Sequence, residues 1–299
     1  MRTLLLLPVA AALFTVFGPT HPAATAPPLP MHSERYPDGR ALEVVGDPSA
    51  ARTVVVLVPG VDTTAANFDR GLGGVQRRAP AWQAHRLADE IAARGGPGAA
   101  ERVAVVAWLG YRTPQGVGLG AAREDLAAAG AAALREFVAR LPGERIVVVG
   151  HSYGSTVAGL AAPRLDRRVT DIVALGSPGM GVDSARDLHT AAHVWAGSAA
   201  DDWTRRIPGA RVLGAGHGAH PYDPSFGAEP LPVGGVEGHD GYFVPGTESL
   251  RALADIALGA APAHKFADFI GDDPQASSEP EPAAAVLRSA PGFPVFPAT

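Results

Sequence analysis

Continuous hydrophobic runs recur along the chain from about residue 41 onward, separated by turn residues and by helical segments. Runs of this kind, rich in valine and isoleucine, are typical of strands buried on both faces of a parallel sheet. We expect such strands at 53–58, 102–108, 145–149 and 169–175. Shorter runs predict an edge strand at 41–45, a strand at 193–196 and a minor strand at 211–213.

Segments with apolar residues at helical spacing lie between these runs. They predict helices at 80–94, 120–141, 155–162 and 247–258, the last with Thr247 as its N-cap. Five alternations of strand and helix predict an α/β fold, a doubly wound, mostly parallel sheet with helices on both faces. In such sheets the ligand site lies beyond the carboxyl ends of the strands. About 16 residues separate Gly176 from His193, too few for a separate cap domain.

Composition narrows the class of partner. The formal net charge is −5 and no run of lysine or arginine interrupts it, which argues against nucleic acid as a partner. The cysteine count of zero excludes disulfides, a thiol nucleophile, a cysteine-ligated metal and a lipid anchor on cysteine.

The N-terminal residues have the pattern of a secretory signal. One arginine precedes an apolar run, and small residues follow up to Ala26. We therefore expect a signal peptide at 1–26 and a secreted or extracytoplasmic protein; the alternative is a retained anchor with loose cell-envelope association. A linker at 27–40, an α/β domain at 41–262 and a Pro/Ala-rich, largely disordered tail at 263–299 complete the expected organisation.

The segment Gly150-His-Ser-Tyr-Gly154 has the form G-x-S-x-G between a β-branched run and a small-residue helix. This strand–turn–helix context is what a nucleophile elbow requires, with the serine exposed in a strained corner. A Cβ at either glycine would collide where strand and helix approach each other. Ser152 is therefore the predicted nucleophile.

A serine hydroxyl needs a base to accept its proton and a carboxylate to orient that base, in the chain order Ser, acid, His. Asp201 and Asp202 directly follow the 193–196 strand, and Asp202 is the preferred acid. The alternative is that Asp202 only caps a helix beginning at Trp203. The fallback acids are Asp183, Asp187 and Asp223.

His239 is the expected base, because it lies in a late loop just before the last helix. His217, His220 and His264 are the other histidines that follow the acid. His217 and His220 could form a metal pair, but they lack a helical pattern and a third ligand, so we expect no metal and no cofactor.

Acyl transfer also needs N–H donors for the developing oxyanion. One expected donor is the backbone of Tyr153; the other comes from Val61 or Asp62, in the loop after the 53–58 strand. Trp108, Tyr111 and Met180 are expected to line the pocket, with core or rim packing as the alternative.

These motifs together resemble the α/β-hydrolase superfamily. The resemblance runs from about Leu42 to Gly259, and it is carried by Pro59-Gly-Val61, the elbow, Gly176-Ser-Pro-Gly179, Asp202-Trp203 and Gly238-His239. Further pieces, Trp108-Leu-Gly-Tyr111, residues 223–227 and Pro245–Leu250, are similar to an exported actinobacterial branch catalogued as a domain of unknown function. The resemblance implies Ser152, Asp202 and His239 as nucleophile, acid and base, and it implies no particular substrate.

The expected function is an exported serine hydrolase that cleaves a carboxylic ester, either a small molecule or a lipid-like ester, through an acyl-enzyme on Ser152. An acyltransferase or a peptidase could use the same triad. A non-catalytic envelope-associated binding protein on the same fold is the alternative from another class. The sequence leaves the acyl-chain length and the oligomeric state open.

Overall fold

The computed structural model describes residues 32–211 and 215–262, and the described residues belong to one compact unit that ends at Pro262. The predicted signal peptide, the tail and most of the minor strand at 211–213 lie outside the described residues. The expected linker is partly structured: β1 pairs with β2 and so extends the sheet ahead of residue 41.

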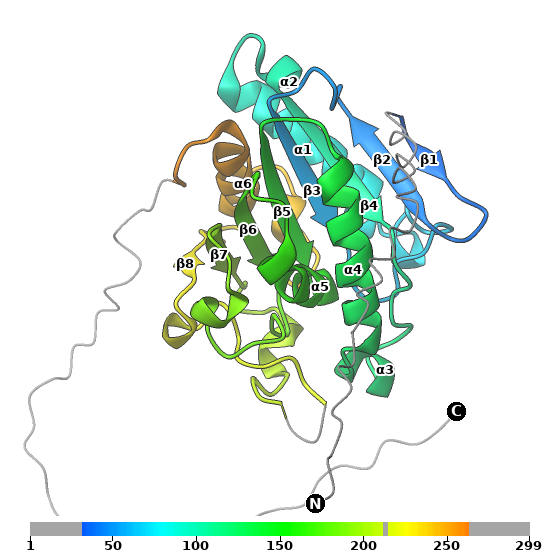
Figure 1. The fold of residues 1–299 in the computed structure, drawn as a ribbon, viewed down its shortest axis with the longest axis vertical. Coiled ribbons are helices and arrows are strands. Elements are labelled where there is room, and N and C mark those ends of the chain that lie inside the picture. The colour runs from blue at the N-terminus through cyan, green and yellow to red at the C-terminus, as the bar shows by residue number, and fades with distance from the viewer. Residues whose placement is uncertain (1–31, 212–214, 263–299) are drawn as a thin grey trace, which may run out of the picture. The chain divides into compact units, whose positions relative to one another are not determined.

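An eight-stranded sheet, in the order β1-β2-β4-β3-β5-β6-β7-β8, organises the described residues (Figure 1). The pairs from β4 to β8 are parallel, while β1 and β2 are antiparallel to their neighbours. The predicted mostly parallel sheet is thus confirmed. The strands are β1 (Glu34–Arg35), β2 (Ala41–Val45), β3 (Thr53–Val58), β4 (Val103–Leu109), β5 (Arg145–His151), β6 (Val169–Leu175), β7 (His193–Gly197) and β8 (Glu229–Pro230).

Helices cover both faces of this sheet (Figure 1). Helix α1 packs against α6 on one face, and α4 packs against α5 on the other. The helix predicted at 120–141 is divided, because the extended backbone of Arg123 separates α3 from α4. The helices are α1 (Pro80–Gly95), α2 (Ala99–Arg102), α3 (Leu119–Ala122), α4 (Asp125–Arg140), α5 (Tyr153–Ala161) and α6 (Glu248–Leu258).

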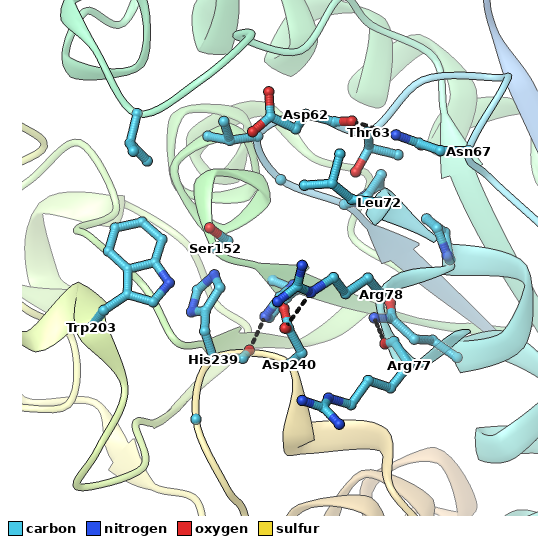
Figure 2. Close-up of a pocket in the computed structure, with 18 of the residues that line it drawn as sticks. Asp62, Thr63, Asn67, Leu72, Arg77, Arg78, Ser152, Trp203, His239 and Asp240 are labelled. Carbon is cyan, nitrogen blue, oxygen red and sulfur yellow. Dashed lines mark hydrogen bonds and ion pairs between the residues drawn. The ribbon is translucent and has the colours of Figure 1, made fainter. Parts of the chain in front are cut away.

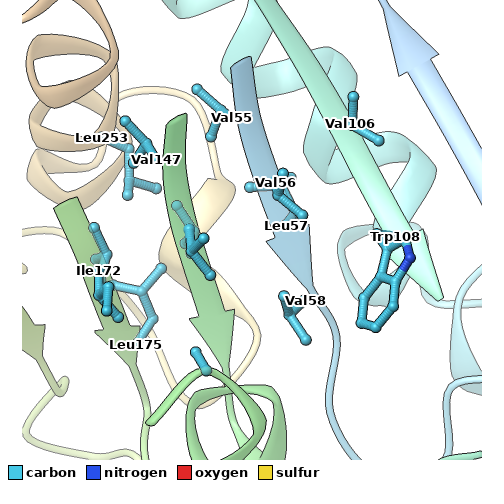
Figure 3. Close-up of a cluster of buried hydrophobic side chains, with 14 of the residues drawn as sticks. Val55, Val56, Leu57, Val58, Val106, Trp108, Val147, Ile172, Leu175 and Leu253 are labelled. Atoms are coloured by element: carbon cyan, nitrogen blue, oxygen red, sulfur yellow. The ribbon is translucent and has the colours of Figure 1, made fainter. Parts of the chain in front are cut away.

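The core lies between the sheet and its helices. Every residue of β3 is buried, as its continuous apolar run predicts for a central strand. Val55 and Val147, on the neighbouring strands β3 and β5, lie in one hydrophobic cluster with Leu253 of α6 (Figure 3). This packing fixes β3, β5, β6 and β7 side by side, so their carboxyl ends open onto one edge of the sheet.

No helix among the described residues is long and apolar enough to cross a membrane.

Candidate active site

Ser152 lies at the sharp corner between β5 and α5. Its backbone has φ 55° and ψ −131°, a conformation that non-glycine residues adopt only when the surrounding structure enforces it. A Cβ at Gly150 would lie 2.5 Å from Ser155 Cα, and one at Gly154 would lie 2.0 Å from the Val58 carbonyl oxygen. The collision expected at both flanking glycines is therefore present, and the chain forms the predicted elbow.

The carboxylate of Asp202 and the imidazole of His239 meet beyond the ends of β6 and β7. His239 Nδ1 lies 2.9 Å from Asp202 Oδ1 and 3.0 Å from Oδ2. The Asp202 side chain is fully buried, while that of His239 keeps 11% of its surface exposed. Among the described residues, Asp202 is therefore the carboxylate that orients this imidazole.

Three further hydrogen bonds hold the Asp202 carboxylate. Tyr242 donates its hydroxyl to Oδ2 at 2.6 Å. Thr204 donates both its backbone N–H (2.9 Å) and its hydroxyl (2.7 Å) to Oδ1. Burial alone would raise the pKa of this carboxyl. The hydrogen bond and charge of His239, together with the hydrogen bonds from Tyr242 and Thr204, outweigh burial and hold the pKa well below its usual range. Asp202 thus stays ionised.

The neighbouring carboxylate, Asp201, has a different task. It accepts from the backbone N–H of Gly238 at 2.9 and 3.0 Å, and so fixes the loop that carries His239. Asp202 also caps the 3₁₀ helix Trp203–Arg206, because its side chain accepts from the Thr204 N–H. The carboxylate therefore both caps this helix and contacts His239.

The alternative acids and bases do not join this arrangement. His217 and His220 are buried, and each binds a backbone carbonyl through Nε2, of Ala121 at 2.7 Å and of Ile207 at 2.8 Å. His217 thus joins its loop to α3, and His220 joins the same loop to Ile207; neither histidine lines the cavity that contains Ser152. Asp187 accepts from the Ser184 hydroxyl within its own surface loop, and Asp183 accepts from the backbone N–H of Ala219 at 3.2 Å. Asp223 begins the 3₁₀ helix Pro224–Phe226, and His264 lies outside the described residues.

Backbone amides for an oxyanion follow β3 and begin α5. Within the described residues, no acceptor is found for the amide of Tyr153 or of Val61. Asp62 is different: its amide donates to the Pro114 carbonyl at 2.9 Å. The expectation that Asp62 could be an oxyanion donor is therefore wrong, and Val61 remains from that pair.

A cavity of about 470 Å³ brings Ser152, His239 and the oxyanion loop together (Figure 2). In this view the His239 ring points toward the Ser152 hydroxyl, with Trp203 beside both. The structure contains no hydrogen bond between the hydroxyl and the imidazole. The other lining residues are Pro59, Gly60, Asp62, Thr63, Asn67, Leu72, Arg77, Arg78, Pro80, Gln83, Val117, His151, Glu237, Gly238 and Asp240.

The pocket residues predicted at Trp108, Tyr111 and Met180 do not line this cavity. Trp108 is 4% exposed and lies against Tyr111 and Phe137, because β4 directs it into the packing between the sheet and α4. Tyr111 donates its hydroxyl to the Pro59 carbonyl at 2.6 Å and thus supports the oxyanion loop from behind. Met180 is fully buried against Gly159. All three are core residues.

Comparison with known proteins decides the family. A family model described as alpha/beta hydrolase matches residues 36–212, more than half of the chain. The chain belongs to the α/β-hydrolase family. The strand order, the elbow and the acid–base pair described above agree with this membership.

The relatives of this α/β hydrolase include two uncharacterized proteins of Mycobacterium tuberculosis. One is 30% identical over 256 residues, which are 74% of this chain and 37% of the relative. The other is 33% identical over 151 residues, which are 48% of this chain and 54% of the relative. The chain thus spans between about a third and about half of the length of these relatives.

Solved structures similar to this α/β hydrolase include an α/β serine hydrolase without lid from Xanthomonas campestris. It is 14% identical, covers 78% of this chain and 97% of its own, and has a TM-score of 0.43. A lipase-esterase related protein from Clostridium acetobutylicum is 12% identical and has a TM-score of 0.29. The match covers 50% of this chain and 51% of that protein.

Sequence reasoning missed two residues that hold the acid of this α/β hydrolase. Tyr242 and Thr204 hold the acid, but no spacing rule says where a hydroxyl points in a short 3₁₀ turn. His151 binds the His239 carbonyl oxygen through Nε2 at 2.8 Å, and the two rings lie 4.6 Å apart. Burial, reinforced by the charge of His239, lowers the pKa of His151 to about 4, so it remains neutral beside the base.

Replacement of Tyr242 by phenylalanine is expected to weaken the site in two ways. Asp202 loses a hydrogen bond to a charged group, and the buried Ala199 N–H loses the acceptor that it has at 3.0 Å. We expect kcat/KM for an ester to fall about tenfold, and the free energy of unfolding to fall by about 1–3 kcal/mol. Steady-state kinetics and urea unfolding measure both. Tyr222→Phe, on a partly buried ring stacked on His220, is the matched control and should change neither. Equal effects in both variants would contradict this role of Tyr242.

Proposed function

We propose that this chain is an exported serine hydrolase that cleaves carboxylic esters through an acyl-enzyme on Ser152. The observation that carries this proposal is the buried Asp202–His239 pair beside the cavity that contains Ser152. The amides of Tyr153 and Val61, which have no acceptor among the described residues, lie next to it. Export rests on the apolar N-terminal segment described above.

In the first half-reaction, Ser152 Oγ attacks the ester carbonyl carbon while His239 Nε2 accepts the hydroxyl proton. The hydrogen bond between the Ser152 hydroxyl and His239 Nε2 forms when substrate is bound, because catalytic hydrogen bonds are often long in the free enzyme and shorten in the complex. The amides of Tyr153 and Val61 stabilise the negative oxygen that forms. His239 then donates its proton to the leaving alcohol as the carbon–oxygen bond breaks, and acyl-Ser152 remains.

Water completes the cycle. His239 accepts a proton from water as its oxygen attacks the acyl carbon, and then returns that proton to Ser152 Oγ when the acid is released. Throughout, the ionised Asp202 accepts from Nδ1–H, fixes the tautomer with Nε2 free, and stabilises the imidazolium.

Pre-steady-state hydrolysis of p-nitrophenyl butyrate tests this proposal. We expect a burst of about one p-nitrophenol per protein followed by slower turnover, because an activated ester acylates Ser152 faster than water hydrolyses the acyl-enzyme. Ser152→Ala should remove the burst and the turnover while circular dichroism remains that of the wild type. Turnover that survives in a folded Ser152→Ala protein would exclude Ser152 as the nucleophile.

A further inference from the structure

The large apolar side chains that are exposed in the described part of the chain are Leu72 (43%), Val117 (69%) and Trp203 (37%), and all three line the cavity that contains Ser152. They come from separate segments, after β3, after β4 and after β7. Figure 2 shows Leu72 and Trp203 on opposite sides of Ser152. Single exposed apolar residues need no explanation, but their convergence on one cavity indicates an apolar ligand surface. We call these three residues the apolar rim.

Two members of the rim are tied to the oxyanion loop by hydrogen bonds through Asp62. Gly116, next to Val117, donates its N–H to Asp62 Oδ1 at 2.6 Å. The side-chain amide of Asn67 donates to the backbone carbonyl of Asp62 at 2.7 Å. The backbone carbonyl of Asn67 accepts from the N–H of Gly71, the residue before Leu72, at 2.7 Å. The backbone next to Leu72 and next to Val117 is therefore tied to the oxyanion loop.

Trp203 contacts the catalytic base. Its ring lies 4.8 Å from that of His239, the group that protonates the leaving alcohol. The oxyanion loop, by contrast, holds the carbonyl oxygen of the acyl group. Trp203 therefore lies beside the group that protonates the leaving alcohol, whereas the backbone next to Leu72 and Val117 is joined to the loop that holds the carbonyl oxygen.

The charges of the cavity do not favour an ionic ligand. Arg78 is neutralised by Asp240, at 2.5 Å from Nε to Oδ2. Asp62, Arg77 and Glu237 form no ion pair among the described residues. The Asp62 carboxylate accepts from the Gly116 N–H, and the exposed Arg77 and Glu237 carry opposite charges. The apolar rim is therefore the feature of this cavity that favours one class of ligand.

We propose that Leu72 and Val117 bind the acyl chain of the substrate, so that this hydrolase selects esters of medium-chain or longer aliphatic acids over acetyl esters. The inference rests on the proposed ester hydrolysis and names its substrate class. Each methylene that moves from water into full apolar contact favours binding by up to roughly fourfold, and a half-covered groove contributes about twofold per methylene. From acetyl to octanoyl this amounts to roughly 60-fold in kcat/KM.

A chain-length series with one leaving group tests the assignment. We would measure kcat/KM for p-nitrophenyl acetate, butyrate and octanoate in the wild type, in the double variant Leu72→Ser/Val117→Ser and in Trp82→Ala. Trp82 is a partly buried surface residue of α1 outside the cavity, and it controls for general loss of apolar surface. We expect the octanoate-to-acetate ratio to fall about tenfold or more in the double variant and to stay at the wild-type value in Trp82→Ala.

The outcomes separate the two proposals. If the folded wild type hydrolyses no ester, both the hydrolase function and the acyl-chain assignment are wrong. If it hydrolyses acetate without a preference for octanoate, or if the preference survives in the double variant, the hydrolase function stands and the acyl-chain assignment is overturned.

Discussion

Replacement of Asp202 by asparagine is expected to lower kcat/KM for p-nitrophenyl esters by about 10³- to 10⁴-fold, while Asp201→Asn lowers it by less than about tenfold. Asparagine keeps the shape of the carboxylate but removes its charge. It can therefore neither stabilise the imidazolium nor fix the Nδ1–H tautomer that leaves Nε2 free as the base. Asp201 binds the backbone of Gly238 and does not touch the imidazole.

Steady-state kinetics of the two variants, with thermal unfolding as the check on folding, measures this difference. The pair is matched in chemistry and adjacent in sequence, so a general effect of charge removal would appear in both. Comparable losses in Asp201→Asn and Asp202→Asn would contradict the assignment of Asp202 as the acid.

Replacement of Gly60 by alanine is expected to lower kcat/KM by about 100-fold or more, with little change in the fold. An added Cβ would lie 2.6 Å from Ser152 Cβ and 3.0 Å from its hydroxyl oxygen, so it would fill the space through which the hydroxyl reaches a carbonyl carbon. Misplacement of a reacting atom by about 1 Å can cost a factor of about 100. The oxyanion loop would also be displaced.

Gly120→Ala is the matched control, because Gly120 lies in α3 with no atom within 4 Å of its added Cβ. There we expect kcat/KM within about twofold of the wild type, since an unconfined surface substitution has small effects. We would measure kcat/KM of both variants and of the wild type with p-nitrophenyl acetate. A Gly60→Ala protein with wild-type kcat/KM would mean that the nucleophile does not act through the space beside Gly60.

Much of the sheet could be predicted because buried parallel strands leave a strong local signal. The limits of β3 and β6 agree with the predicted 53–58 and 169–175, where apolar runs end in glycine or proline. The two-residue strands β1 and β8 left no such signal, since their pairing depends on distant partners. The division between α3 and α4 also escaped prediction, because alanine-rich sequence favours helix on both sides of it.

The elements of the site could be ordered from the sequence, but their contacts could not. Chain order pointed to Ser152, a carboxylate after β7 and a late histidine. The choice between Asp201 and Asp202 depends on which way each side chain turns in a tight loop. The rim residues Leu72 and Val117 were missed because both stand in glycine-rich loops without a periodic pattern. Trp108 was misplaced because its position at the end of β4 does not reveal which face of the sheet it covers.

Labelling of the folded protein with a fluorophosphonate probe tests the central claim, that Ser152 is an activated nucleophile, most directly. Intact-mass and peptide mass spectrometry should show one label per protein, on the peptide that contains Ser152. Ser152→Ala should take up no label, and Asp202→Asn should react much more slowly. A folded wild-type protein that takes up no label, or that carries it on another residue, would contradict the account.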